Sequence, residues 1–156
     1  RFGLLIALVG MALAFLMTRE TPAQAAAGAT SIVGAHAVGV ADGGPGLPLV
    51  GWSTVGGDLR VAHFVGLHAL QALPVIAWLI GRFAPGWLPT RRRVALVQIA
   101  GVGYLGLTLL LAWQALRGQS LIAPDGRTLA AFGALLALVA AAMAAALGLA
   151  QRATAR

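Results

Sequence analysis

Four long apolar runs restrict this chain of 156 residues to a membrane-embedded fold. They cover approximately residues 2–18, 61–81, 94–116 and 128–150. A helix needs roughly 20 apolar residues to cross the hydrocarbon core, so three runs are long enough and the first is slightly short. Charged residues make up 10% of the chain, against about 25% in soluble domains. The pattern predicts an all-α integral membrane four-helix bundle, a single transmembrane domain in contact with the lipid bilayer.

The first run allows a second interpretation. One basic residue, an apolar run and small residues near 23–27 are also typical of a cleaved signal peptide. The run is at the upper length limit for a signal peptide and three further spans follow, so we expect a retained first helix. Because the chain opens on Arg1 rather than Met, whether residues precede it is left open.

The arginines indicate the orientation of the spans. All eleven basic residues are arginines, and they flank the apolar runs instead of forming one face. If the first run leaves the cytoplasm, seven arginines lie inside, four lie outside, and all four acids lie outside. An excess of arginine in cytoplasmic loops sets orientation. We therefore expect both termini in the cytoplasm, and we do not expect nucleic acid as the partner that explains the net charge of +7.

The predicted outer loop, residues 19–60, is the longest segment outside the runs. Residues 23–41 carry no charge, which favours a short helix or a re-entrant piece at the interface. The stretch Asp42–Pro48 is rich in Gly and Pro and predicts a rigid turn structure that cannot face lipid. Long ordered loops are more often functional or docking surfaces than passive links. We expect a polar patch near this surface, formed by Asp42, Trp52, Asp58 and Gln71.

Polar residues cluster on one side of the second run. At 100° per residue, Arg60, His63, His68, Gln71 and Trp78 share an arc of about 140°. Polar residues within a membrane usually face the bundle interior or a cavity, so we expect this arc to face inward. Two other residues have local structural interpretations: Asp58 can cap the helix N-terminus, and Pro74 predicts a kink.

Three interpretations of the histidines stay open. His63 and His68 lie five residues apart, about 7.5 Å along a helix, so they cannot both bind one metal ion or both be axial ligands of one haem. They could form interhelical hydrogen bonds, bind a b-type haem or other tetrapyrrole, or line a proton or ligand path. A haem would need a second ligand such as His36, and Arg60 would suit a propionate.

Other chemistry has little support in the sequence. The absence of cysteine excludes disulfides, thiolate catalysis and Fe–S clusters. No Ser-His-Asp arrangement or other catalytic or metal-ligating group stands out, so we lean against an enzyme. The third run contains a G-x-G-x-x-G match at Gly101–Gly106, but no strand precedes it, and close helix packing is the better explanation. We expect the hydroxyl of Tyr104, which is also in this run, to face a neighbouring helix.

The outer loop and second run together carry a resemblance. The block formed by Asp42–Pro48, Gly51–Ser53 and Gly57–Gln71 resembles an uncharacterised family of small four-helix bacterial inner-membrane proteins with no assigned activity. The resemblance implies a bacterial inner-membrane location and a four-helix architecture, but no mechanism. We expect an accessory or assembly component that docks on a larger membrane protein complex through its periplasmic loop. A haem protein in electron transfer or quinone chemistry is the alternative, and a channel or transporter is third.

Overall fold

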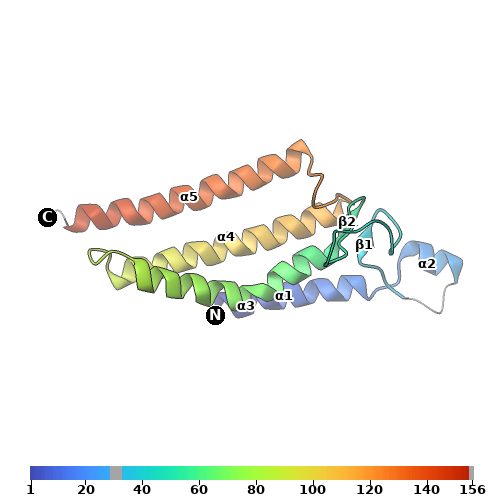
Figure 1. Ribbon diagram of the computed structural model, residues 1–156, viewed down its shortest axis with the longest axis horizontal. Coiled ribbons are helices and arrows are strands. Elements are labelled where there is room, and N and C mark those ends of the chain that lie inside the picture. Colours follow the sequence, from blue (N-terminus) through green and yellow to red (C-terminus); the bar gives the residue numbers. More distant parts are fainter. Residues whose placement is uncertain (29–32, 155–156) are drawn as a thin grey trace.

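The computed structural model describes residues 1–28 and 33–154, and Figure 1 shows the course of the chain. In order, the described elements are α1 (Phe2–Met17), α2 (Pro22–Ala27), β1 (Ala37–Val38), β2 (Gly57–Asp58), α3 (Leu59–Phe83), α4 (Thr90–Leu116) and α5 (Gly126–Thr154). Within this part of the chain, four helical segments are long and apolar enough to cross a membrane. These are Phe2–Ala27, which joins α1 and α2, then Leu59–Phe83, Thr90–Leu116 and Gly126–Gly148. The four predicted spans are therefore confirmed by length and composition.

Several predicted boundaries were too narrow. α3 exceeds the range 61–81 by two residues at each end, α4 begins at Thr90 instead of 94, and α5 runs from Gly126 to Thr154 instead of 128–150. The apolar runs understate the helices because arginines at the helix ends keep their charged heads in water while the backbone stays helical. The two strands were also missed by the all-α prediction; they pair antiparallel, with Ala37 opposite Asp58 and Val38 opposite Gly57.

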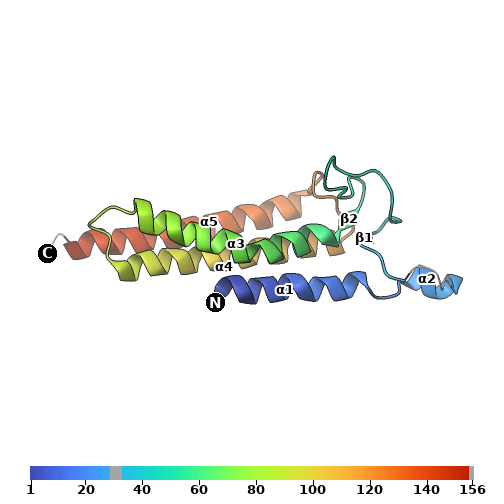
Figure 2. The same ribbon diagram turned by 60° about the horizontal axis from the view of Figure 1, so that its bottom comes forward.

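The long helices form an open arrangement around α4. α4 lies between α5 on one side and the pair formed by α1 and α3 on the other (Figure 1). α5 packs substantially against α4 alone, so the four helices of the predicted bundle are present but do not enclose one shared core. α1 lies beside only part of the length of α3 and α4 (Figure 2), and its first turn reaches the middle of α3, where Gly3 meets Ala69.

Glycines set how closely the helices approach. A Cβ atom added to Gly66 of α3 would lie 2.7 Å from the Cα atom of Gly10 in α1. Cβ atoms added to Gly103 and Gly106 of α4 would lie within 3 Å of side-chain atoms of α5. Small residues allow helix backbones to approach closely. In lipid, where the hydrophobic effect does not drive helices together, this close van der Waals packing stabilises their association. The packing interpretation of the Gly101–Gly106 motif is thus confirmed.

Most of the polar arc of α3 faces away from the other helices, so the prediction that the arc lines the bundle interior was wrong for His68, Gln71 and Trp78. His63, at the edge of the arc, does contact α1, through the carbonyl oxygen of Gly10. The buried residues on the opposite side of the helix are small or apolar: Ala62, Gly66, Ala69 and Leu73. His68, Gln71 and Trp78 are exposed. Close approach by small residues, and not the burial of polar groups, decides which side of this helix packs.

Two local expectations for the helices hold. The Tyr104 hydroxyl donates a hydrogen bond to the carbonyl oxygen of Val65 in α3, at 2.7 Å, so it faces a neighbouring helix as predicted. α3 continues through Pro74 as one helix, and Figure 1 shows it bending near its middle, where proline removes a main-chain donor.

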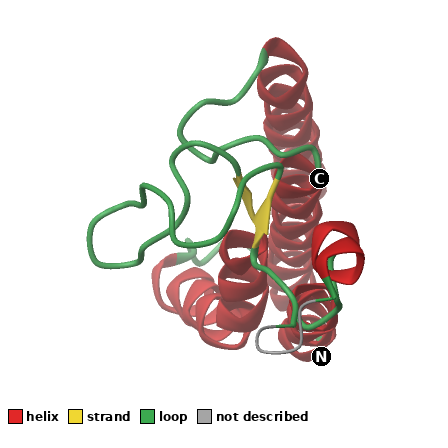
Figure 3. Cartoon of the chain, turned by 90° about the vertical axis from the view of Figure 1, so that its right-hand side faces the viewer, coloured by secondary structure: helices red, strands yellow, loops and turns green. Residues whose placement is uncertain are grey.

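The segments that join α1 to α3 and α4 to α5 gather at one end of the helices, as the end-on view in Figure 3 shows. We call residues 33–58 and 117–125 the cap. α2 fits the short helix that we expected within 23–41, although residues 29–32 of that stretch lie outside the described residues. The cap contains four of the eight residues proposed for a functional site, and Arg60 follows directly after it.

Candidate functional site

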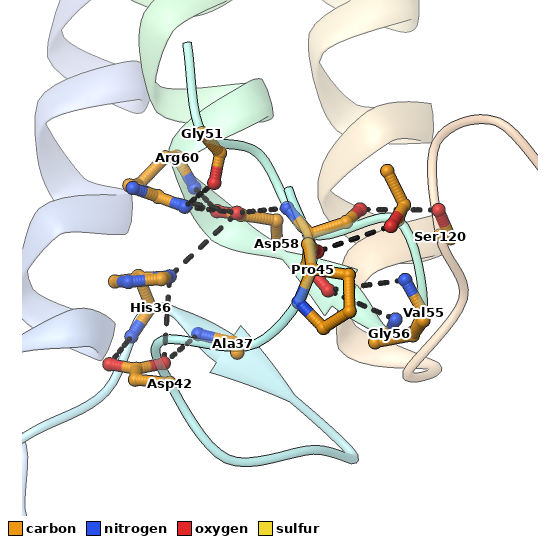
Figure 4. Close-up of polar contacts among 12 residues, drawn as sticks. His36, Ala37, Asp42, Pro45, Gly51, Val55, Gly56, Asp58, Arg60 and Ser120 are labelled. Atoms are coloured by element: carbon orange, nitrogen blue, oxygen red, sulfur yellow. Dashed lines mark hydrogen bonds and ion pairs between the residues drawn. The ribbon is translucent and has the colours of Figure 1, made fainter. Parts of the chain in front are cut away.

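Asp58 is the centre of a hydrogen-bond network in the cap (Figure 4). It ends β2 and caps α3, where its side chain accepts a hydrogen bond from the backbone N–H of Arg60. The residue is 3% exposed, and its Oδ2 atom accepts from the backbone N–H of Ser53 at 2.9 Å. Burial acts to raise the pKa of Asp58, but the hydrogen bonds from Arg60 and Ser53 outweigh it, so the pKa lies below its ordinary value. Asp58 is therefore an ionised anchor, and its predicted role as a cap is confirmed.

Arg60 joins this anchor to the neighbouring loop. Its guanidinium contacts both carboxylate oxygens of Asp58, with Nη2 at 2.7 Å from Oδ2. The same Nη2 donates to the carbonyl oxygen of Gly51 at 2.6 Å. An arginine paired with a carboxylate forms strong and well-oriented hydrogen bonds. Arg60 thus holds the loop in place, and its role toward a haem propionate stays a prediction.

We call residues 45–54 the tip loop, and its backbone is tightly hydrogen-bonded. Leu47 N–H donates to Trp52 at 2.8 Å, Gly51 N–H donates to Leu47 at 2.8 Å, and Thr54 N–H donates to Pro45 at 3.0 Å. In the middle of this loop, Leu49 has a φ of 70° and is fully exposed, at 107% of its reference area. A positive φ is unfavourable for a side chain with a Cβ atom. The loop therefore holds Leu49 in a strained backbone conformation with its side chain fully exposed.

His36 and Asp42 form the other side of the network (Figure 4). The Asp42 carboxylate accepts hydrogen bonds from the backbone N–H groups of His36 and Ala37, at 3.2 and 2.8 Å. The Nδ1 atom of His36 lies 3.5 Å from Asp42 Oδ1 and 3.7 Å from Asp58 Oδ2. It is buried without a hydrogen-bond partner among the described residues. A cavity of about 110 Å³ adjoins His36 and Arg60, enough for a few water molecules.

The end of α4 fastens the cap through residues that the sequence analysis did not select. The Gln114 side chain donates to the carbonyl oxygen of Ser120 at 2.8 Å, and the Ser120 hydroxyl donates to that of Ser53 at 3.2 Å. A Cβ atom on Gly57 would lie 1.9 Å from the carbonyl oxygen of Ala115. No local pattern marks these residues, since each contact joins distant parts of the chain.

A second ion pair lies at the start of α5. Asp125 accepts a hydrogen bond from the backbone N–H of Thr128 at 2.8 Å and pairs with Arg117. The hydrogen bond from Arg117 lowers the pKa of Asp125. An aspartate three residues before a backbone donor at a helix start is a recognisable N-cap signal, so the sequence could have identified this residue.

The histidines do not meet at one site. His36 lies in the cap, whereas the Nδ1 atom of His63 is 2.8 Å from the carbonyl oxygen of Gly10. The Nδ1 atom of His68 is 2.8 Å from the carbonyl oxygen of Phe64, within α3 itself. Within residues 1–28 and 33–154, no group of three His, Asp or Glu side chains is placed to hold a metal ion.

The structure therefore brings together four of the eight selected residues: His36, Asp42, Asp58 and Arg60. The ring of Trp52 does not join this group and packs edge-on against Phe64, with ring centroids 5.5 Å apart. Phe64 in turn stacks on the ring of His68, with centroids 3.8 Å apart. His63, His68 and Gln71 belong to α3 outside the cap.

The charged groups around Asp58 bind the backbone of the cap. Asp42, Asp58 and Arg60 all have main-chain partners, which is typical of a network that fixes a loop in one conformation. The Ser120 hydroxyl also contacts backbone groups of the cap. Within the described chain it has no contact with a histidine of the kind that a catalytic serine needs. No protein-family model, curated protein or solved structure matches the chain, so its own geometry must support any functional conclusion.

Proposed function

We propose that the chain is a small multi-pass protein of the bacterial inner membrane that works as a non-enzymatic accessory or assembly component. In this proposal both termini are cytoplasmic, the cap lies on the periplasmic side, and the cap docks on a larger membrane protein complex. The observation that carries the proposal is the exposed Leu49 in the middle of an otherwise hydrogen-bonded loop.

Leu49 combines two unfavourable features. Its backbone conformation costs on the order of 1–3 kcal/mol, and its side chain gains nothing from burial. Val50 and Val55 are also exposed nearby in the chain, at 42% and 56%. Strained conformations persist where the surrounding structure enforces them, and they concentrate at ligand clamps and similar functional sites. A partner that buries Leu49 would recover about 1.5–3 kcal/mol.

The anchor behind the loop supports the same conclusion. Arg60 connects the carbonyl oxygen of Gly51 to the buried Asp58, so the loop is already ordered before it meets a partner. Ordering an interface in advance removes part of the entropy cost of association. The charges of the cap thus contribute to docking indirectly, by keeping Leu49 in position.

The test uses two substitutions that differ in their effect on stability. Leu49→Gly relieves the positive φ, so it should stabilise the chain by about 0.5–1 kcal/mol, while Leu49→Ser keeps the strain. Both remove the apolar contact, and both should reduce recovery of the complex from native membranes by about tenfold or more. Unchanged recovery with both variants would refute the proposal.

A photo-crosslinking residue identifies the partner. Placed at Leu49, it should give one discrete crosslinked membrane protein. The matched control is Ile122, an apolar residue in the other segment of the cap, 58% exposed. Crosslinking at Ile122 should be weak or should involve different proteins. Equal crosslinking to the same proteins from both positions would mean that the tip loop has no special role.

A b-type haem protein is the second candidate, and one observation favours it. The Nδ1 atoms of His63 and His68 each face a main-chain carbonyl, which accepts only, so each Nε2 atom keeps a lone pair. Histidines that bind metals usually have this arrangement. The two rings leave α3 in directions about 140° apart, so only one could serve a given haem. Reduced and oxidised visible spectra of the purified protein test this: sharp reduced α and β bands would support a cytochrome, and a flat spectrum would exclude it.

A further inference from the structure

α3 presents two polar side chains, His68 and Gln71, among apolar residues on the side opposite its packed face. We call this the outer α3 face; its residues are exposed and consist of Phe64, His68, Gln71, Val75 and Trp78. Ala62, Gly66, Ala69 and Leu73, which contact the other helices, are buried on the opposite side. In a membrane-spanning helix this is an inverted pattern, since polar groups normally face protein. The polar groups of the outer α3 face therefore require a protein surface that shields them from lipid.

The depth of Gln71 makes this requirement strong. It is the middle residue of the 25-residue α3, so it lies near the centre of any bilayer that the helix crosses. A side-chain amide there has two donors and an acceptor oxygen, and lipid tails satisfy none of them. His68 lies one helical turn nearer the cap, about 4.5 Å along the axis. Because its Nδ1 atom faces the Phe64 carbonyl, its Nε2 atom is left as an acceptor.

We propose that a second copy of this chain covers the outer α3 face, with the two α3 helices parallel. Two copies with the same orientation place their Gln71 residues at the same depth without further adjustment. The glutamine amide both donates and accepts, so the two residues can bond to each other or to the Nε2 atom of His68 across a twofold axis. A single polar residue in an otherwise apolar helix interface commonly fixes its register.

The aromatic residues near the cap extend this interface. Trp52 contacts Phe64, and Phe64 stacks on His68, so an apolar ladder continues from the outer α3 face to the tip loop. Trp78 marks the other end of the face and is 62% exposed. The dimer does not depend on the docking proposed above, because it uses the helix and not Leu49.

The absence of cysteine from the chain allows a clean test. In vesicles of phosphatidylethanolamine and phosphatidylglycerol, the full chain with Val75→Cys should form a disulfide-linked dimer upon oxidation. Val75 is 53% exposed on the outer α3 face. The control is Leu138→Cys on α5, which is 70% exposed on a helix that the proposal leaves facing lipid. It should give little dimer at the same protein-to-lipid ratio.

Gln71→Leu then tests the hydrogen bonds. Energy transfer between labelled copies, measured during dilution with lipid, should show about tenfold weaker association for Gln71→Leu, because two symmetry-related bonds are lost. Gln71→Asn should recover part of the affinity. Energy transfer at the level of random encounters in the unsubstituted chain would overturn the proposal. So would equal dimer from both cysteine positions, or a Val75→Cys crosslink that appears only in native membranes and only to another protein.

Discussion

Replacing the Asp58 carboxylate by an amide tests how the cap is held together. Asp58→Asn keeps the size and one acceptor oxygen of the side chain, but the new amide group must face either the Ser53 N–H or the Arg60 guanidinium, and both are donors. Breaking a buried ion pair costs about 3–5 kcal/mol. Arg60 is one-third exposed, so water compensates part of the loss, and we expect about 2–3 kcal/mol.

The measurement is the free energy of unfolding in mixed detergent micelles, followed by tryptophan fluorescence, since Trp52 lies in the tip loop. Asp42→Asn is the matched control. Its carboxylate also accepts two backbone hydrogen bonds, but it is 37% exposed, so the cost should stay below about 1 kcal/mol. In a double-mutant cycle, Asp58→Asn and Arg60→Gln should be strongly non-additive. Additive effects, or equal losses for the two aspartates, would refute the central role of Asp58.

Four further changes test the packing and the charges. Gly57→Ala should prevent closure of the cap and expose it to proteolysis, because its Cβ atom would lie 1.9 Å from a backbone oxygen. Gly66→Val should cost at least about 1–3 kcal/mol by separating α3 from α1, whereas Gly133→Ala, with open space around its Cα, should be neutral or slightly stabilising. Tyr104→Phe removes one interhelical hydrogen bond and should cost about 0.6 kcal/mol, at most about 1.7. Because folding lowers the pKa of Asp58, its contribution to stability is complete above its ordinary pKa and declines as the pH falls through the lowered value. Unfolding measured from about pH 5 down to about pH 2 should show this loss, and Asp58→Asn should reduce it.

The spans and several local contacts could be predicted from sequence because their causes are local. A run of apolar residues is enough to indicate a spanning helix. Asp58 stands directly before α3, where a carboxylate satisfies free N–H groups. The isolated position of Tyr104 among apolar residues requires a partner for its hydroxyl, and α3 provides one.

The orientation of α3 and the closure of the cap could not be predicted in this way. Polarity predicts the packed side of a helix only where burial is the driving force; in α3 the contact between Gly66 and Gly10 decides it. The pairing of β1 with β2 involves two residues on each strand, too few for a recognisable alternation. The bond between Ser53 and Ser120 joins residues 67 positions apart, and nothing near either serine indicates the other.

That last bond has a consequence for the order of events during synthesis. The tip loop is made before α3 and α4, yet it is fastened by Ser120 and fits against the end of α4 at Ala115. At about 5–20 residues per second, roughly 3–13 s separate the synthesis of Ser53 from that of Ser120. During this time the loop can form its internal hydrogen bonds and its contacts with Asp58 and Arg60, but it lacks the contacts that fix it to the end of α4. Completion of the cap therefore requires that the third long helix has been made and placed, so a partner that needs the finished cap would select chains whose first three long helices are assembled.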